Sequence, residues 1–74
     1  MRYYAVDFPN SVTLFVISPF NAQSMIRDMI AARGLRGHSG TIYNPKAFLS
    51  VSEIIGPNKQ QKRAALNLNE ALVG

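Results

Sequence analysis

Few side chains in this sequence could act as acids, bases or metal ligands. His38 is the only imidazole, there is no cysteine, and the only acidic residues are Asp7, Asp28, Glu53 and Glu70. No two of these residues have the spacing of a catalytic or metal-binding motif, and no glycine-rich phosphate signature is present. The sequence therefore predicts a protein that is not an enzyme and that uses no metal ion or other cofactor.

The composition instead favours binding to another macromolecule. Only 16% of the 74 residues are charged, against about a quarter in an ordinary globular domain. A domain of this size leaves much of its surface exposed to water, and contiguous exposed apolar patches usually mark contact with a partner. The net charge is +4, which favours an acidic partner.

The basic residues are unevenly placed, because Arg2 and Asp7 are the only charges in residues 1–26. The segment 32–40 combines Arg33, Arg36 and His38 with three glycines. Its side chains offer hydrogen-bond donors and its glycines allow close approach of the backbone, so it is a candidate binding loop for a phosphate or a carboxylate.

The elements that would position these residues begin with a β-hairpin. Alternation predicts a strand over Tyr3–Phe8, a turn at Pro9-Asn10, and a returning strand over Ser11–Ser18. The second strand is apolar on both faces, so it is either central in a sheet or half exposed to a partner. The outer face of the hairpin, with Tyr3 of the first strand and Phe15 and Ile17 of the second, is the candidate contact surface for a partner or for a second copy of the chain.

A 3.6-residue period predicts a helix over Pro19–Arg33, capped by Ser18 or Asn21 and closed by Gly34 in a left-handed conformation. The next residues are predicted to form a loop that leads into a short strand over Thr41–Tyr43.

The segment Phe48–Gly56 is compatible with either a strand or a short helix, because it alternates but also holds Ser50 and Glu53 at capping-box spacing. Asn58 is predicted to cap a final helix over Lys59–Leu72. The predicted fold class is α+β, in a single domain of residues 1–74 whose last part, 57–74, is either a separate helix or a flexible basic tail.

The stretch KAFLSVSEIIGPNKQQKRAALNL resembles the helix-turn-helix of small excisionase or AlpA-type regulators. The resemblance implies that Val51 and Ile55 pack inward and that Gly56 makes the turn. It also implies DNA or RNA binding by the second helix, through Lys59, Gln60, Lys62 and Arg63.

In size and composition the chain also resembles phage or mobile-element proteins that bind host machinery such as RNA polymerase. The function expected from the sequence is therefore that of a regulator that binds a larger protein assembly at an acidic site and modulates it, with nucleic-acid binding as the alternative. The absence of cysteine and of a signal-peptide core leads us to expect a cytoplasmic protein with no membrane association.

Overall fold

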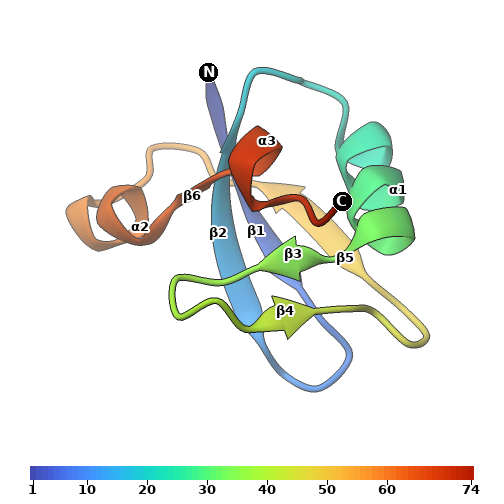
Figure 1. Cartoon of the computed structure of the whole chain (residues 1–74). Helices are drawn as coiled ribbons and strands as arrows, with labels where there is room; N and C mark the ends of the chain where they lie inside the picture. Colours follow the sequence, from blue (N-terminus) through green and yellow to red (C-terminus); the bar gives the residue numbers. More distant parts are fainter.

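The N-terminal hairpin predicted from the sequence is present in the computed structural model, which describes residues 1–74 (Figure 1). Strand β1 (Arg2–Asp7) pairs with the antiparallel strand β2 (Thr13–Ser18). The predicted core face is confirmed, because the exposed fractions of Tyr4 and Val6 are 0% and that of Phe8 is 5%. The fold class is mixed α+β, as expected.

The hairpin forms the centre of a four-stranded sheet with the order β5-β1-β2-β6. Strand β5 (Ser50–Glu53) is antiparallel to β1, so the ambiguous segment is a strand at this point. Strand β6 (Leu66–Asn67) is parallel to β2 on the other side. Strand β2 is thus central in the sheet; Val16 on its inner face is buried, and Phe15 and Ile17 on its outer face are half-buried.

Helix α1 (Gln23–Arg33) ends where the sequence predicts but begins later than Pro19. Its N-cap is Ala22, which makes no side-chain capping bond, so the expected caps Ser18 and Asn21 are wrong. The Ser18 hydroxyl accepts a hydrogen bond from the Phe20 N–H at 2.9 Å, and the Phe20 carbonyl accepts one from the Tyr4 hydroxyl at 3.2 Å. These two bonds hold the connection to the end of the sheet before the helix begins.

After α1 the chain forms a second, two-stranded sheet. Strand β4 (Ile42–Tyr43) corresponds to the strand predicted over Thr41–Tyr43, and it pairs with β3 (Leu35–Arg36) in a segment that was predicted to be a loop. Gly34 joins α1 to β3 with a φ of 84° and a ψ of 166°. The positive φ agrees with the prediction, but this ψ belongs to an extended conformation that is open almost only to glycine, not to the left-handed helical region.

The single final helix predicted over Lys59–Leu72 is wrong. Helix α2 (Lys59–Ala64) ends before the extended β6, and a one-turn helix α3 (Leu68–Ala71) follows. The interruption of the helix at Leu66 places this residue opposite Val16 in the sheet. The residues that follow form α3, which lies over a face of the sheet. The predicted cap is confirmed, because Asn58 and Gln61 form a capping box at the start of α2.

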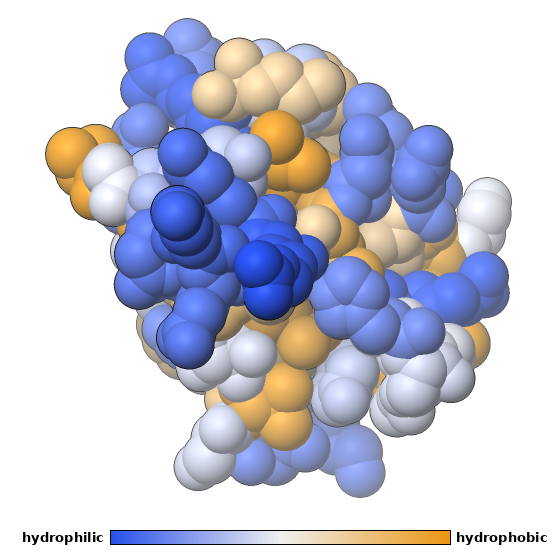
Figure 2. Space-filling view, turned by 90° about the vertical axis from the view of Figure 1, so that its left-hand side faces the viewer, coloured by the Kyte–Doolittle hydropathy of each residue, from blue (hydrophilic) through white to orange (hydrophobic).

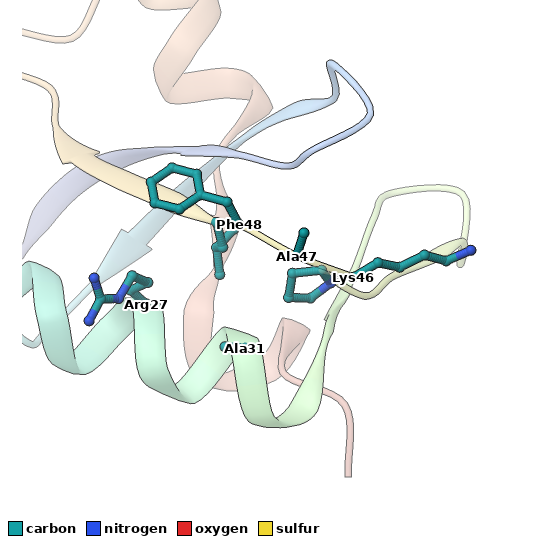
Figure 3. A pocket seen from close by; sticks show the side chains of 7 residues that line it. Arg27, Ala31, Lys46, Ala47 and Phe48 are labelled. Carbon is teal, nitrogen blue, oxygen red and sulfur yellow. The ribbon is translucent and has the colours of Figure 1, made fainter.

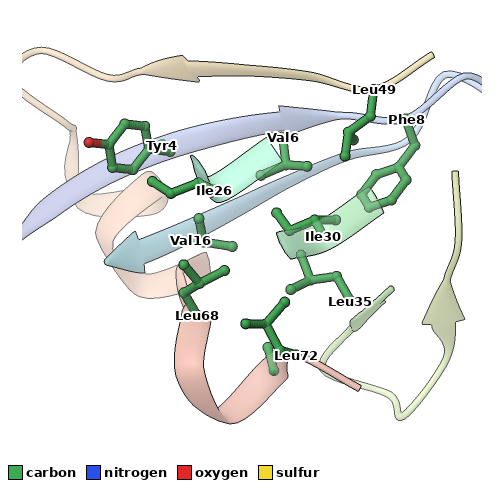
Figure 4. Packing of buried hydrophobic residues seen from close by; sticks show 11 residues of the cluster. Tyr4, Val6, Phe8, Val16, Ile26, Ile30, Leu35, Leu49, Leu68 and Leu72 are labelled. Atoms are coloured by element: carbon green, nitrogen blue, oxygen red, sulfur yellow. The ribbon is translucent and has the colours of Figure 1, made fainter. Parts of the chain in front are cut away.

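A core of eleven buried hydrophobic residues fills the space between the sheet, α1, α3 and β3 (Figure 4). Helix α1 packs against β5 and contributes Ile26 and Ile30 to this core. Leu68 and Leu72 join the same core from the C-terminal segment (Figure 4). Tyr4 lies in this core, and burial raises the pKa of its phenol; the carboxylate of Glu53 raises it further, while Arg2 acts in the opposite direction.

The C-terminal residues are bound to the junction between α1 and β3. The Val73 N–H donates to the Gly34 carbonyl at 3.2 Å, and the Arg33 Nε donates to the Val73 carbonyl at 2.9 Å. Together with the buried Leu68 and Leu72, these bonds make the segment after α2 part of the core instead of a flexible tail. No helix in the structure has the length and apolar character needed to cross a membrane.

Candidate functional site

The three residues of the predicted sheet contact surface lie together. The register places Tyr3 opposite Ile17 and Phe15 opposite Ala5, on the face of the hairpin that points away from the core. All four side chains are half-buried. The structure therefore brings Tyr3, Phe15 and Ile17 to one face, and their contact with a partner stays a prediction.

The half-burial of this face has a topological cause. Strands β5 and β6 lie at opposite edges of the sheet, so the connection that contains α2 must cross from one edge to the other. In the view of Figure 1 this connection passes behind β1 and β2, whereas α3 lies in front of them. Helix α2, which lies within this connection, packs against β2.

The residues of the predicted binding loop do not form one open loop. Arg33 ends α1 and bonds the Val73 carbonyl, while Arg36 is an exposed residue of β3. The Nε2 atom of His38 lies 2.7 Å from the Ala64 carbonyl oxygen, at the end of α2. Because a carbonyl only accepts, Nε2 must carry the hydrogen in this contact. His38 thus attaches the turn between β3 and β4 to α2.

Helix α2 presents the other predicted set of residues, and all of them are exposed: Lys59, Gln60, Lys62 and Arg63. No carboxylate pairs with these cations, because the two ion pairs of the structure join Arg2 to Glu53 and Arg27 to Asp28. Figure 2 looks onto the side of the molecule that carries α2, and strongly hydrophilic residues gather there beside apolar ones. The His38 contact brings the two basic segments, 33–38 and 59–63, to neighbouring positions.

The helix-turn-helix arrangement implied by the resemblance is not formed. Residues 50–53, which would belong to its first helix, are strand β5 and pair with β1. Ile55, expected to pack inward, is 83% exposed, whereas Val51 packs against the core as expected. The alternation of the segment decides the outcome, because β1 offers an open edge to which an alternating strand can pair.

Sequence reasoning missed the surroundings of β5. Phe48 precedes this strand with 69% of its surface exposed, and Ile55 follows it with 83% exposed. Arg27 of α1 lies across from Phe48 (Figure 3). The sequence is compatible with either a strand or a helix over residues 48–56, so it does not reveal this site. Only a strand has an edge at which another chain can pair. The alternation of Leu49, Val51 and Glu53 was the available signal.

The positions of the side chains also bear on catalytic and metal chemistry. The His, Asp and Glu side chains form no group of three that could hold a metal ion. The structure instead offers three surfaces for contact: the outer face of the hairpin, the basic surface at α2, and the edge of β5. The chain matches no protein-family model, no curated protein and no solved structure.

Proposed function

We propose that this chain is a small non-enzymatic regulatory protein that binds a larger protein assembly and modulates its activity. The observation that carries the proposal is the pair of large apolar side chains, Phe48 and Ile55, exposed at the two ends of β5. Exposed apolar residues beside an unpaired strand edge favour association with another protein. The favoured assembly is a host transcription complex such as RNA polymerase, acted on in the manner of phage or mobile-element regulators in the cytoplasm.

The charge distribution supports an acidic contact site on that partner. The net charge is +4, and the cations of α2 have no carboxylate partners. Such cations at the rim of an interface accelerate association with an acidic surface and make it sensitive to salt.

The first test measures binding to purified RNA polymerase by interferometry, together with transcription from a promoter template. We expect saturable binding and altered transcription. Phe48→Ser combined with Ile55→Ser should weaken binding by about tenfold or more, since each change removes a side chain whose burial is worth about 1.5–3 kcal/mol.

The matched control for this double variant is Ile42→Ser, which changes an apolar side chain that is 45% exposed on β4. It should bind like the unchanged protein, and thermal melts of all the proteins should coincide because the residues are exposed. If RNA polymerase does not bind the unchanged protein, and transcription is the same with and without it, this choice of partner is refuted.

The unpaired cations of α2 favour nucleic-acid binding as a second candidate function. If it holds, the protein will bind random duplex DNA in fluorescence anisotropy between about 50 and 200 mM salt, with each phosphate contact adding about 0.9 to the slope of log K against log salt. Lys62→Ala with Arg63→Ala should lower that slope by about 2, and Gln60→Ala should leave it unchanged. Absence of binding at the lowest salt would remove this candidate.

A further inference from the structure

Strand β5 has an outer edge that no strand occupies, because it is the last strand of the sheet on the β1 side. The Ile54 N–H donates to the Tyr3 carbonyl at 2.8 Å. Antiparallel pairs alternate between hydrogen-bonded and non-bonded positions, so Ser52 also directs its main-chain groups toward β1. Val51 and Glu53 therefore direct theirs outward, where a further strand can pair with them.

A groove lies between this edge and α1 (Figure 3). It consists of two adjoining hollows of about 380 and 240 Å³, which share Arg27, Phe48 and Leu49. The buried Leu49 gives it an apolar wall, and the ring of Phe48 stands exposed above it. One hollow reaches Ser50 and Val51 of β5, so the groove and the free strand edge are continuous.

The charge of the groove selects its occupant. Its only charged lining residues are Arg27 and Lys46. The carboxylate of Glu53, farther along β5, does not line it and is paired with Arg2 at 3.2 Å. The ammonium group of Lys46 extends outward, whereas Arg27 faces Phe48 across the hollow (Figure 3). Arg27 is 3.3 Å from Asp28, but both side chains are about half exposed or more. Such a pair is weak, and the guanidinium keeps further donors for another carboxylate.

We propose that an extended acidic segment of the partner protein adds to β5 as a further strand of the sheet and places a carboxylate against Arg27. The main chain of Val51 and Glu53 supplies the pairing, as in other cases of strand addition, and the groove supplies the side-chain selection. In the added strand, the side chain of the residue that pairs with Val51 points to the face of the sheet that α1 covers, because paired residues share a face. A second copy of this chain fits less well, because it brings the same cations to the groove.

The probe for this site is a fluorescein-labelled peptide of eight residues in which Val and Glu alternate. Anisotropy should show saturable binding, about tenfold tighter than that of the same peptide with Lys in place of Glu, as expected for one charge-assisted hydrogen bond. A third peptide keeps the Val and Glu residues but is N-methylated at alternate amides, and it should not bind because it lacks the pairing donors. Equal binding of the methylated and unmethylated peptides would overturn strand addition.

Two variants of Glu53 distinguish the contribution of its main-chain N–H to peptide binding from that of its side chain. Glu53→Pro removes the outward N–H, and proline is tolerated at sheet edges. Glu53→Ala removes the same carboxylate and its ion pair with Arg2 but keeps the N–H. We expect the proline variant to lose peptide binding and the alanine variant to keep it. If the proline variant is unfolded in a thermal melt, the N-methylated peptide gives the same information with the unchanged protein.

Arg27→Glu tests the charge selection and should reverse the preference, so that the Lys peptide binds more tightly than the Glu peptide. An unchanged preference would remove Arg27 from the site. A size-exclusion mass twice that of the chain, abolished by Glu53→Pro, would show that a second copy occupies the edge and would overturn the acidic segment.

This inference rests on the proposed function, because it describes how the protein partner is held, and the two fail in different ways. If Glu53→Pro binds RNA polymerase as well as Glu53→Ala does, the strand-addition proposal is wrong while the regulatory function stands. If the polymerase does not bind but the Val-Glu peptide does, in a manner that depends on Arg27, the choice of assembly is wrong while the site stands.

Discussion

Leu68→Ala is expected to lower the free energy of unfolding by about 3 kcal/mol, within the range of about 2–5 kcal/mol for a buried leucine. The side chain is 0% exposed and packs in the core from the C-terminal segment. A chain of 74 residues has a total stability of roughly 4–11 kcal/mol, so this one change removes a large part of it. The melting temperature should fall by about 10 °C or more, measured by circular dichroism.

The matched control is Ile55→Ala, which removes a similar apolar side chain that is 83% exposed. Its melting temperature should stay within about 4 °C of that of the unchanged protein, because exposed substitutions typically change stability by no more than about 0.5 kcal/mol. A small effect of Leu68→Ala would show that residues 66–73 are not part of the cooperative unit. The flexible-tail interpretation of 57–74 would then be restored.

Gly34→Ala is the second change for which we expect a large loss of stability, about 3 kcal/mol. Its φ of 84° with ψ of 166° is a combination that costs a residue with a Cβ about 1–3 kcal/mol. In addition, an added Cβ would collide with the Asn44 side-chain oxygen and lie 3.3 Å from the Tyr43 carbonyl. Chemical denaturation measures the loss.

The control Gly40→Ala has a similar φ of 88° but nothing within 4 Å of an added Cβ, so it reports backbone strain without the collision. It should cost about 1 kcal/mol. Combining Gly34→Ala with Asn44→Ala should recover about 1 kcal/mol relative to the sum of the single changes, because the two residues are in contact. If the losses of unfolding free energy in the two single variants add up to that of the double variant, the Asn44 side chain moves aside in Gly34→Ala without a loss of stability.

The parts of the fold that local pattern decides were predictable from the sequence. The alternation of Tyr4, Val6 and Phe8 specifies a core face, and the turn residues fix the hairpin. The period of α1 places Ile26 and Ile30 inward. The capping residue Asn58 marks the start of α2 because its side chain satisfies a free N–H of the first turn.

The rest depends on pairing between distant segments. Leu66 is extended because β2 offers it an edge, although the residues that precede it are good helix formers. Leu35 and Arg36 are a strand only because Tyr43 and Ile42 lie opposite them. For the same reason the edge of β5 was not predictable as a site: its free main-chain groups exist only once β1 has paired on the other side.

The parallel pairing of β6 with β2 also determines when the protein can fold during its synthesis. Val16 and Leu66 come from opposite ends of the chain, and closing so long a loop has a high entropic cost that local contacts do not offset. The hairpin can form early, but the sheet gains its last strand and the core gains Leu68 and Leu72 only after those residues have left the ribosome. We therefore expect the nascent chain to stay loosely structured, with the apolar face of its hairpin uncovered, until residue 72 has left the ribosome.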